Sequence, residues 1–326
     1  KEPFTNEEIS GTEPDQLVED FLQMRRLVFY KKASKKKWQE IHQDAQKWRT
    51  FADTVLVRLE QHIDARPSRP VPALCFDVAP RLYSAVMGLT DFHWGLRADV
   101  GLSGEVWDRV VARERLFTAT DEVLSQVVKL GRPEKIFVPV GSDFLHVDND
   151  HAKTTAGTPQ DIDGSPAELL TSACDLLEDW IDIIRSVAPV ELVFIEGNHD
   201  RLLGLSLLLV LEALYRNAPD VTVSKDRSAR QYRQYGQNLL GFAHGDGRKA
   251  GKPVDLIGHM AREAAEMWGQ CAHKTYYTGH RHHEVTSAGS TSGVVCRQIP
   301  CLSGASRWAA REGYQGSPRP LPLYVH

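Results

Sequence analysis

Five short polar segments, each placed at the end of an apolar run, constrain this chain more than any other feature of its sequence. They are Asp91-Phe-His93, Gly141-Ser-Asp143, Gly197-Asn-His-Asp200, His244-Gly-Asp246 and Gly279-His-Arg-His282. The apolar runs predict strands at 85–90, 135–140, 191–195, 239–242 and 274–277, with a further strand at 294–299, and helix-period segments lie near 104–130, 166–187, 201–216 and 253–269. This alternation predicts an α/β layered core. Because α/β sheets bind ligands beyond the carboxyl ends of their strands, we expect the five segments to meet there.

The side chains of these segments are of the kinds that bind divalent metals. Carboxylates, imidazoles and an amide together suit cations of intermediate hardness, such as Mn²⁺, Fe or Zn²⁺. Two such cations, roughly 3.5–4 Å apart, can hold the attacking and the leaving oxygens of a phosphoester. A single aspartate or histidine on a polar surface would mean little, but repeated placement at strand ends indicates a hydrolase.

The composition sets limits on the class of protein. The 326 residues are 42% hydrophobic and 25% charged, which is typical of a soluble globular chain, and the formal net charge is −4. This charge gives no overall attraction for nucleic acid, so a polyanion would have to bind at a local patch. No run reaches the ~20 apolar residues of a membrane span. Together with a polar amino end and five cysteines without C-x-x-C spacing, this leads us to expect a cytoplasmic protein that does not enter a membrane.

The residues before the first polar segment have a different character. We predict an N-terminal helical extension with a Pro-rich linker at 1–72, followed by the catalytic domain at 73–326. Segment 21–38 combines seven Lys and Arg with interleaved aromatic residues and contains no acid. Such a run either contacts single-stranded nucleic acid by charge and stacking or forms a helix with its rings turned inward. The extension could also join copies of the chain into a homo-oligomer.

The five segments, in this order, resemble the motif set of the calcineurin-like metallophosphoesterases, and the resemblance covers roughly residues 85–310. It implies a four-layer α/β/β/α sandwich with two central sheets. It also implies hydrolysis of a phosphoester by metal-activated water, with two divalent metal ions as cofactors. Mn²⁺ is the first choice, and Fe, Zn²⁺ or Ni²⁺ are alternatives. The whole chain is similar to phosphoesterases carried by phages and prophages, which is compatible with DNA processing.

The resemblance assigns a role to individual residues. One metal would be held by Asp91, His93 and His282, the other by Asn198, His244 and His280, with Asp143 bridging both. The catalytic residue His199 would stabilise the charge of the transition state or protonate the leaving oxygen. Asp200, also predicted to be catalytic, would either orient the His199 imidazole or cap the following helix.

One segment departs from the family pattern. The family usually has Gly-Asp, whereas here Ser142 separates Gly141 from Asp143, and we interpret this as a tolerated variant of the loop. The continuation Phe144-Leu-His146 is similar to the DNA-repair exonuclease branch of the superfamily, whose corresponding segment ends in a histidine. His146 is therefore a candidate for substrate contact or for a structural hydrogen bond.

Other polar residues near the motifs have two interpretations each. Arg201 and His283 are candidates for substrate contact, and His283 and Glu284 could instead orient the histidines that precede them. The polar segment 148–163 either lines the substrate cleft or is a surface excursion.

The favoured function is a phosphodiesterase that acts on nucleic acid or nucleotides, and therefore a nuclease or a nucleotide phosphodiesterase. A phosphomonoesterase or a small cyclic-nucleotide phosphodiesterase is an alternative, because the net charge is negative and no known DNA-binding module is present. A non-catalytic metal-binding scaffold is the other alternative. The sequence alone leaves the substrate, the native metal and the oligomeric state open.

Overall fold

The computed structural model describes residues 82–224, 226–247, 253–288, 293–306, 310–311 and 321–326, together with three single residues nearer the amino end. All the helices and strands named below belong to the unit Thr54–His326. The predicted extension at 1–72, its basic segment 21–38 and the boundary at residue 72 lie outside the described residues. In the described part of the chain, no helix has both the length and the apolar composition needed to cross a membrane.

The first sheet has the strand order β10-β1-β2-β3-β4. Its strands are β1 (Ser84–Met87), β2 (Lys135–Gly141), β3 (Val190–Ile195), β4 (Val221–Val223) and β10 (Leu323–Val325). Strands β1 to β4 run parallel, and β10 pairs antiparallel with β1. Strands β2 and β3 are buried almost throughout, as expected for parallel strands covered on both faces. The carboxyl ends of β1, β2 and β3 therefore meet at one edge.

The second sheet has the strand order β5-β6-β7-β9-β8. Its strands are β5 (Arg230–Tyr235), β6 (Asn238–Ala243), β7 (His273–Thr278), β8 (Val285–Ala288) and β9 (Val294–Gln298). The central strands β6, β7 and β9 are parallel, whereas β5 and β8 pair antiparallel at the two edges. The ends of β6 and β7 are the points at which the fourth and fifth polar segments begin.

The two sheets pack face to face through apolar side chains. This shared core consists of Val86, Phe137, Val193, Ile195, Leu240, Phe242, Tyr277 and Ile299. The rings of Phe242 and Tyr277 are stacked with their centroids 5.4 Å apart. An ionic contact also joins the sheets, because the Glu191 carboxylate on β3 accepts hydrogen bonds from Lys135 Nζ at 2.9 Å and from Arg233 Nε on β5.

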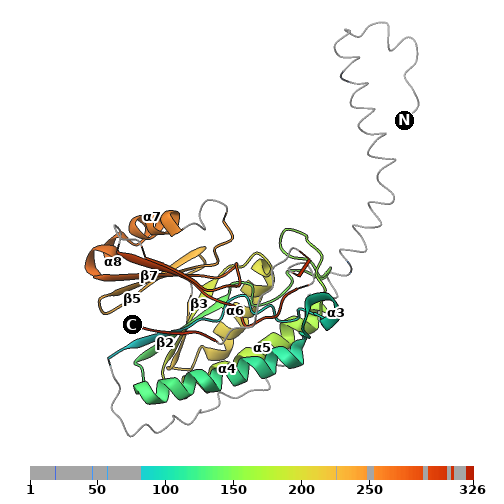
Figure 1. The fold of residues 1–326 in the computed structure, drawn as a ribbon, viewed down its shortest axis with the longest axis horizontal. Helices are drawn as coiled ribbons and strands as arrows, with labels where there is room; N and C mark the ends of the chain where they lie inside the picture. Colours follow the sequence, from blue (N-terminus) through green and yellow to red (C-terminus); the bar gives the residue numbers. More distant parts are fainter. Residues whose placement is uncertain are drawn as a thin grey trace, which may run out of the picture. The chain divides into compact units, whose positions relative to one another are not determined.

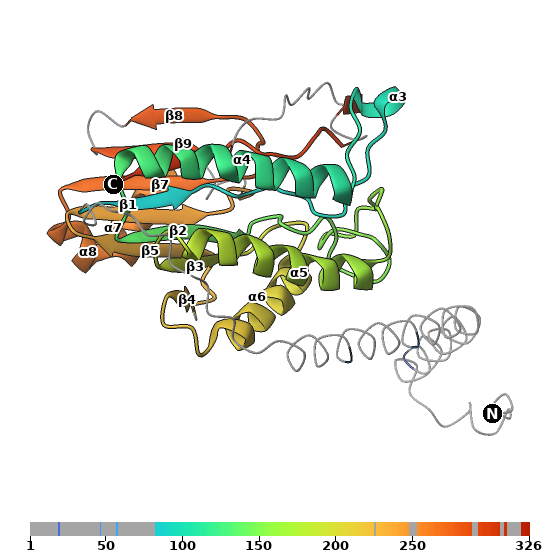
Figure 2. The ribbon, with the colours of Figure 1, turned by 90° about the horizontal axis from the view of Figure 1, so that it is seen from below.

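Helices cover the outer face of each sheet, which gives four layers (Figures 1 and 2). The helices are α3 (Val100–Ser103), α4 (Arg109–Leu130), α5 (Pro166–Arg185), α6 (Arg201–Tyr215), α7 (Pro253–Glu263) and α8 (Ala265–Gln270). Helices α4, α5 and α6 lie on the first sheet, and α7 and α8 lie on the second. The α/β/β/α arrangement that the family resemblance implied is thereby confirmed.

Local sequence signals determine where α5 begins. The Ser165 hydroxyl accepts a hydrogen bond from Glu168 N at 3.3 Å, and the Glu168 carboxylate accepts one from Ser165 N at 2.8 Å. This reciprocal capping box, with Pro166 at the start of the helix, satisfies backbone groups that an α-helix leaves unpaired. The inner face of α5 then buries Leu169, Leu176, Trp180 and neighbouring apolar residues.

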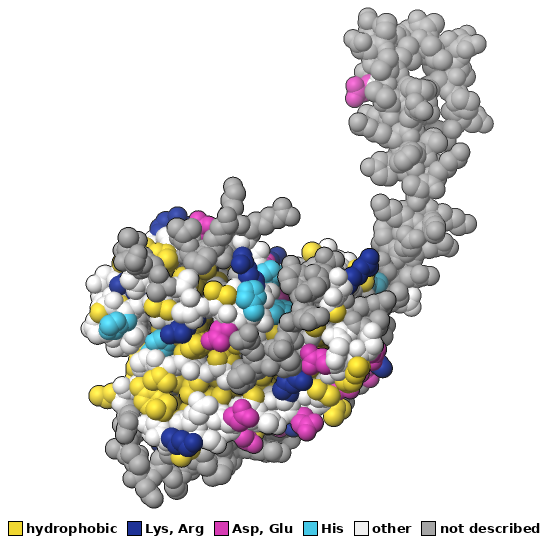
Figure 3. Space-filling view, in the orientation of Figure 1, with side chains coloured by type: hydrophobic (Ala, Val, Ile, Leu, Met, Phe, Trp, Pro, Cys, Tyr) yellow, Lys and Arg dark blue, Asp and Glu magenta, His cyan; other side chains and the backbone are white. Residues whose placement is uncertain are grey.

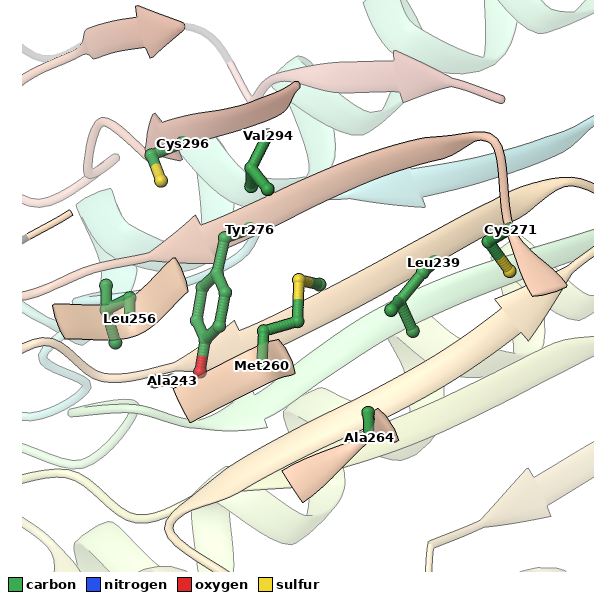
Figure 4. Close-up of a cluster of buried hydrophobic side chains, with 9 residues drawn as sticks. All are labelled: Leu239, Ala243, Leu256, Met260, Ala264, Cys271, Tyr276, Val294 and Cys296. Atoms are coloured by element: carbon green, nitrogen blue, oxygen red, sulfur yellow. The ribbon is translucent and has the colours of Figure 1, made fainter. Parts of the chain in front are cut away.

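Helix α7 covers the second sheet, and its Leu256 and Met260 lie in one apolar cluster with Leu239 and Tyr276 of the sheet (Figure 4). A Cβ atom at Gly241 would lie 2.9 Å from Met260 Cε and 2.8 Å from a ring carbon of Tyr276, which explains the glycine at this position. The helix-period segment at 253–269 forms two helices rather than one. Ala264 separates them, because its backbone, with φ −116 and ψ 40, is not helical.

Replacing Thr120 on α4 with valine is expected to lower the free energy of unfolding by about 1–3 kcal/mol. Trp180 is fully buried, and its indole Nε1–H donates to the Thr120 hydroxyl at 2.7 Å. Valine preserves the shape of the side chain but leaves a buried donor without its partner. Urea denaturation measures the loss. Thr120→Ser retains an acceptor and should cost clearly less, so equal losses for the two variants would contradict this account.

Candidate metal centre

The ends of five parallel strands bring the polar segments together. Asp91 follows β1, Asp143 follows β2, Asn198 follows β3, His244 follows β6 and His280 follows β7. Backbone hydrogen bonds link neighbouring segments, since Asp91 N donates to the Ser142 carbonyl at 2.8 Å and Gly279 N donates to the His244 carbonyl at 2.9 Å. Segments that are up to about 190 residues apart in sequence, such as those of Asp91 and His280, thus form one site.

The first cluster consists of Asp91, His93 and His282, whose ligand atoms lie within 4.8 Å of one another. The Nε2 atoms of His93 and His282 are 3.2 Å apart, and Asp91 Oδ1 is 3.4 Å from His282 Nε2. Two imidazole nitrogens bound to one tetrahedral metal at about 2.0–2.1 Å would be separated by about 3.3 Å. The observed spacing therefore fits a shared cation.

The second cluster consists of Asp143, His244 and His280, again within 4.8 Å. His244 Nε2 lies 3.1 Å from Asp143 Oδ2 and 2.9 Å from Asn198 Oδ1, which adds the amide oxygen of Asn198 to this group. The clusters adjoin, because His280 N donates to both carboxylate oxygens of Asp91, at 2.9 and 2.8 Å. The structure thus places all seven predicted ligands in two adjoining groups, while their assignment as ligands remains a prediction.

In each cluster, a carboxylate favours positive charge on the histidine beside it. Burial lowers the pKa of His244, but the charge of Asp143 and a hydrogen bond to it outweigh this effect and raise the pKa to about 9. Burial also opposes the charged form of His282, but a hydrogen bond with Asp91 raises its pKa well above the ordinary value. Burial opposes ionisation of Asp143, yet His244 holds the Asp143 pKa below its usual range. A divalent cation at either cluster would satisfy the same carboxylates.

The backbone of the site is unusual. Among the described residues, seven that are not glycine have φ in the left-handed region, and six of them lie in this site. The six are Asp91, His93, Ser142, Asp143, His280 and His282, with φ between 50 and 71. This conformation costs of order 1–3 kcal/mol per residue and is concentrated at functional sites in proteins. Five of the seven predicted ligands are therefore among the residues with a strained backbone.

Gly197 and Gly279 leave space for the carboxylates of Asp143 and Asp91, respectively. A Cβ atom at Gly197 would overlap Asp143 Oδ1 and Asp143 N, and one at Gly279 would overlap Asp91 Oδ2. Gly197 and Gly279 therefore each lie against the carboxylate of another segment, which explains why a larger residue does not fit.

His199 and His146 lie beside the first cluster. The centroid of the His199 ring is 4.7 Å from that of His93, and its Nδ1–H donates to the His146 carbonyl at 3.0 Å. The His146 ring is buried, and its Nδ1 is 3.2 Å from His93 Nδ1, on the side of the His93 ring opposite its contact with His282. Burial lowers the pKa values of His93 and His146. This geometry favours a structural hydrogen bond between the Nδ1 atoms of His93 and His146, while substrate contact by His146 remains a prediction.

Asp200 makes neither of the contacts considered from the sequence. Its carboxylate accepts hydrogen bonds from Asp143 N at 3.2 Å and Leu145 N at 3.0 Å, and it makes no side-chain bond that caps α6. Asp200 is 1% exposed, and burial together with the charge of Asp143 raises its pKa to about 8. Its observed contacts hold the loop that carries Asp143.

The remaining substrate candidates lie around the site. Arg201 pairs with Glu196 at 3.3 Å, and both line a shallow pocket that also includes His244 and Asp246. His283 is exposed, and its Nδ1 lies 2.6 Å from the Arg281 carbonyl. Figure 3 shows histidine side chains near the middle of this face, with Lys, Arg and acidic side chains close by, and further histidines at its left edge. None of these contacts identifies a substrate.

Asp148 ties the start of segment 148–163 to α6, a role that the sequence pattern did not predict. Its Oδ1 accepts hydrogen bonds from Leu202 N at 2.6 Å and Leu203 N at 2.9 Å, so it satisfies the first turn of α6 from 54 residues away. Its Oδ2 accepts from the Thr155 hydroxyl at 2.7 Å, and Thr155 N donates to the Asn198 carbonyl at 3.2 Å. The start of segment 148–163 is thus tied to the segment that carries His199.

Asp148→Ala is expected to lower the free energy of unfolding by about 2 kcal/mol, the upper end of the range for loss of a helix cap. The variant leaves two backbone N–H groups of α6 without an acceptor, whereas Asp148→Asn retains a side-chain oxygen and should lose less. Chemical denaturation of the three proteins measures the difference. If asparagine were as destabilising as alanine, the cap would not be the main role of Asp148.

Comparisons with known proteins return only remote similarity. No family model and no curated protein matches this chain. Among solved structures, similarity extends to a predicted phosphoesterase from Streptococcus pneumoniae TIGR4, with 12% identity, 68% of this chain and 74% of the other covered, and a TM-score of 0.30. Vps29 from Entamoeba histolytica, in complex with Zn²⁺, has 13% identity, coverage of 68% and 77%, and a TM-score of 0.32. An archaeal phosphodiesterase has 9% identity, coverage of 68% and 84%, and a TM-score of 0.32. TM-scores this low do not establish a function for this chain, which has to be inferred from the residues of the site.

Proposed function

We propose that this chain is a two-metal phosphodiesterase of the calcineurin-like metallophosphoesterase superfamily, acting on nucleic acid or nucleotides, with Mn²⁺ as the preferred cation. The observation that carries the proposal is the adjoining pair of clusters, Asp91–His93–His282 and Asp143–His244–His280, with Asn198 at the second. The mixture of carboxylate, imidazole and amide donors is suited to such cations. Bound there, two divalent cations would supply an acidified water and charge stabilisation for a phosphoester.

The chain's own groups supply the remaining chemistry. The His146 carbonyl can only accept a hydrogen bond, so it fixes the proton of His199 on Nδ1. Nε2 of His199 is then the ring atom that can exchange a proton with the leaving oxygen. The backbone N–H of His199 donates to Asp143 Oδ1 at 2.7 Å, which couples the position of this imidazole to the predicted bridging carboxylate.

The preference for a diester is supported by the sequence similarity of Phe144-Leu-His146 to the exonuclease branch. The proposal is tested by incubating end-labelled single- and double-stranded DNA with the protein and Mn²⁺, with a chelator control. Bis-p-nitrophenyl phosphate and p-nitrophenyl phosphate are assayed in parallel. Mn²⁺-dependent cleavage of DNA or of the diester is the expected result. Hydrolysis of the monoester alone would replace the proposal with the phosphomonoesterase alternative, and the absence of any hydrolysis would favour a scaffold.

His199→Ala is expected to lower kcat by about 10²- to 10⁴-fold, the usual contribution of a general acid or base. The metal content should not change, because His199 is not one of the seven predicted ligands. Activity is measured as above, and bound metal by elemental analysis. His273→Ala, which alters an exposed histidine at the start of β7, is the control and should retain full activity. Full activity of the His199 variant would exclude the proposed proton transfer.

A further inference from the structure

Ser142 is the residue inserted between the Gly and the Asp of the usual Gly-Asp motif. It lies where three segments of the site meet. Its backbone N donates to the Ile195 carbonyl at the end of β3 at 2.7 Å, and its carbonyl accepts from Asp91 N at 2.8 Å. Its side chain is fully buried, and Oγ lies 2.9 Å from His244 Nδ1. Ser142 therefore contacts both predicted metal clusters, one through its backbone and one through its hydroxyl.

The two nitrogens of His244 face different groups. Nε2 points to the oxygens of Asp143 and Asn198, at 3.1 and 2.9 Å, where the second metal is expected. Nδ1 faces the Ser142 hydroxyl. A histidine that binds a metal through Nε2 must carry its proton on Nδ1, and this proton then needs an acceptor. The Ser142 hydroxyl oxygen provides it.

We propose that Ser142 is a positioning residue that fixes the His244 ring with its proton on Nδ1, so that Nε2 faces the second cation. The inference rests on the proposed two-metal function. This role explains the additional serine, which from the sequence alone is interpreted as a loop variant. The backbone of Ser142 is strained, with φ 52, and in this conformation its hydroxyl reaches His244. Strain of this kind is concentrated at functional sites, which agrees with a role for Ser142 in positioning His244.

If Ser142 has this role, replacing it should change the Mn²⁺ affinities of the two metal sites by different amounts. In Ser142→Ala the His244 Nδ1–H has no acceptor, and the affinity of the second site for Mn²⁺ should fall about 10- to 100-fold, as is typical when a partner of a metal-bound histidine is removed. The affinity of the first site, at Asp91, His93 and His282, should change much less. Alanine and serine have the same steric penalty in the left-handed region, so backbone strain is matched between the two proteins.

The test is calorimetric titration of the metal-free proteins with Mn²⁺. Ser84→Ala is the matched control, because Ser84 is equally buried but lies on β1, and its hydroxyl has no hydrogen-bond partner among the described residues. Weakening of one of two sites in Ser142→Ala, with both sites unchanged in Ser84→Ala, is the expected result. Two unchanged sites in Ser142→Ala would overturn the role of Ser142 and leave the proposed function intact. A wild-type protein that binds no Mn²⁺ would overturn both.

A second measurement does not require the variant to fold. Nitrogen-15 NMR of the wild-type imidazoles, recorded with Zn²⁺ because it is diamagnetic, reports which nitrogen of His244 carries the proton. We expect a protonated Nδ1 and a metal-bound Nε2. A protonated Nε2 with metal on Nδ1 would contradict the inference, even if the calorimetric result could be explained in another way.

Discussion

Asp143→Ala should lower kcat/KM for a phosphodiester by at least about 10³-fold, since loss of several kcal/mol of charge stabilisation corresponds to a change of this size. Asp143 is 1% exposed, and its two carboxylate oxygens have separate partners, with Oδ2 next to His244 and Oδ1 accepting from His199 N. The variant removes a predicted ligand of both metals and also the acceptor that positions His199. We therefore expect metal binding and turnover to be lost together.

Steady-state kinetics at saturating Mn²⁺ and elemental analysis of the purified protein measure the two effects. Asp143→Asn retains the shape of the side chain and an acceptor for His199 N but lacks the charge, so it separates the ligand role from the positional one. Asp179→Ala on α5 is the control, because this aspartate is 43% exposed and, within the described part of the chain, forms only a surface ion pair with Arg113. An Asp143→Ala protein that retains a tenth of the wild-type activity would refute the bridging role.

Gly197→Ala should inactivate the protein without changing any polar group. The added Cβ would overlap both Oδ1 and the backbone N of Asp143, and the loop would have to move away from the bridging position. Overpacking of this kind costs about 1–3 kcal/mol of stability. A displacement of 1 Å at a reacting centre costs about 100-fold in rate. We expect a folded protein with a lowered Tm and at least that loss of activity.

The matched control is Gly258→Ala on α7, where an added Cβ meets no atom of the described residues within 4 Å. That variant should be as stable as the wild type, or more stable by up to about 1 kcal/mol, because alanine is the better helix former. Thermal unfolding and the diester assay applied to both variants compare the positions directly. Equal activity of the two proteins would mean that the Asp143 loop tolerates movement.

The sequence predicts strands β2, β3 and β6 well because each is an apolar run that is buried almost throughout. Strand β2 was expected at 135–140 and is observed at Lys135–Gly141, and β6 was expected at 239–242 and is observed at Asn238–Ala243. The edge strand β5, Arg-Gln-Tyr-Arg-Gln-Tyr, was not predicted. It has no apolar run, and its pairing with β6 depends on tertiary context that local propensity does not contain.

The candidate site was predictable for a related reason. Polar residues directly after buried parallel strands are brought together by the sheet itself, so Asp91, Asp143 and Asn198 could be grouped before any coordinates were known. The contacts of Asp148 and Asp200 could not be predicted, because each is a hydrogen bond between side chain and backbone that spans more than 50 residues. Such bonds leave no periodic signal in the sequence.

The most direct test of the two-metal centre is a crystal structure of the protein soaked with Mn²⁺, with anomalous difference density recorded at the manganese edge. We expect two peaks, roughly 3.5–4 Å apart, with Asp143 bonded to both. One peak is expected beside Asp91, His93 and His282, and the other beside Asn198, His244 and His280. A single peak, or two peaks that do not share Asp143, would contradict the proposed two-metal centre.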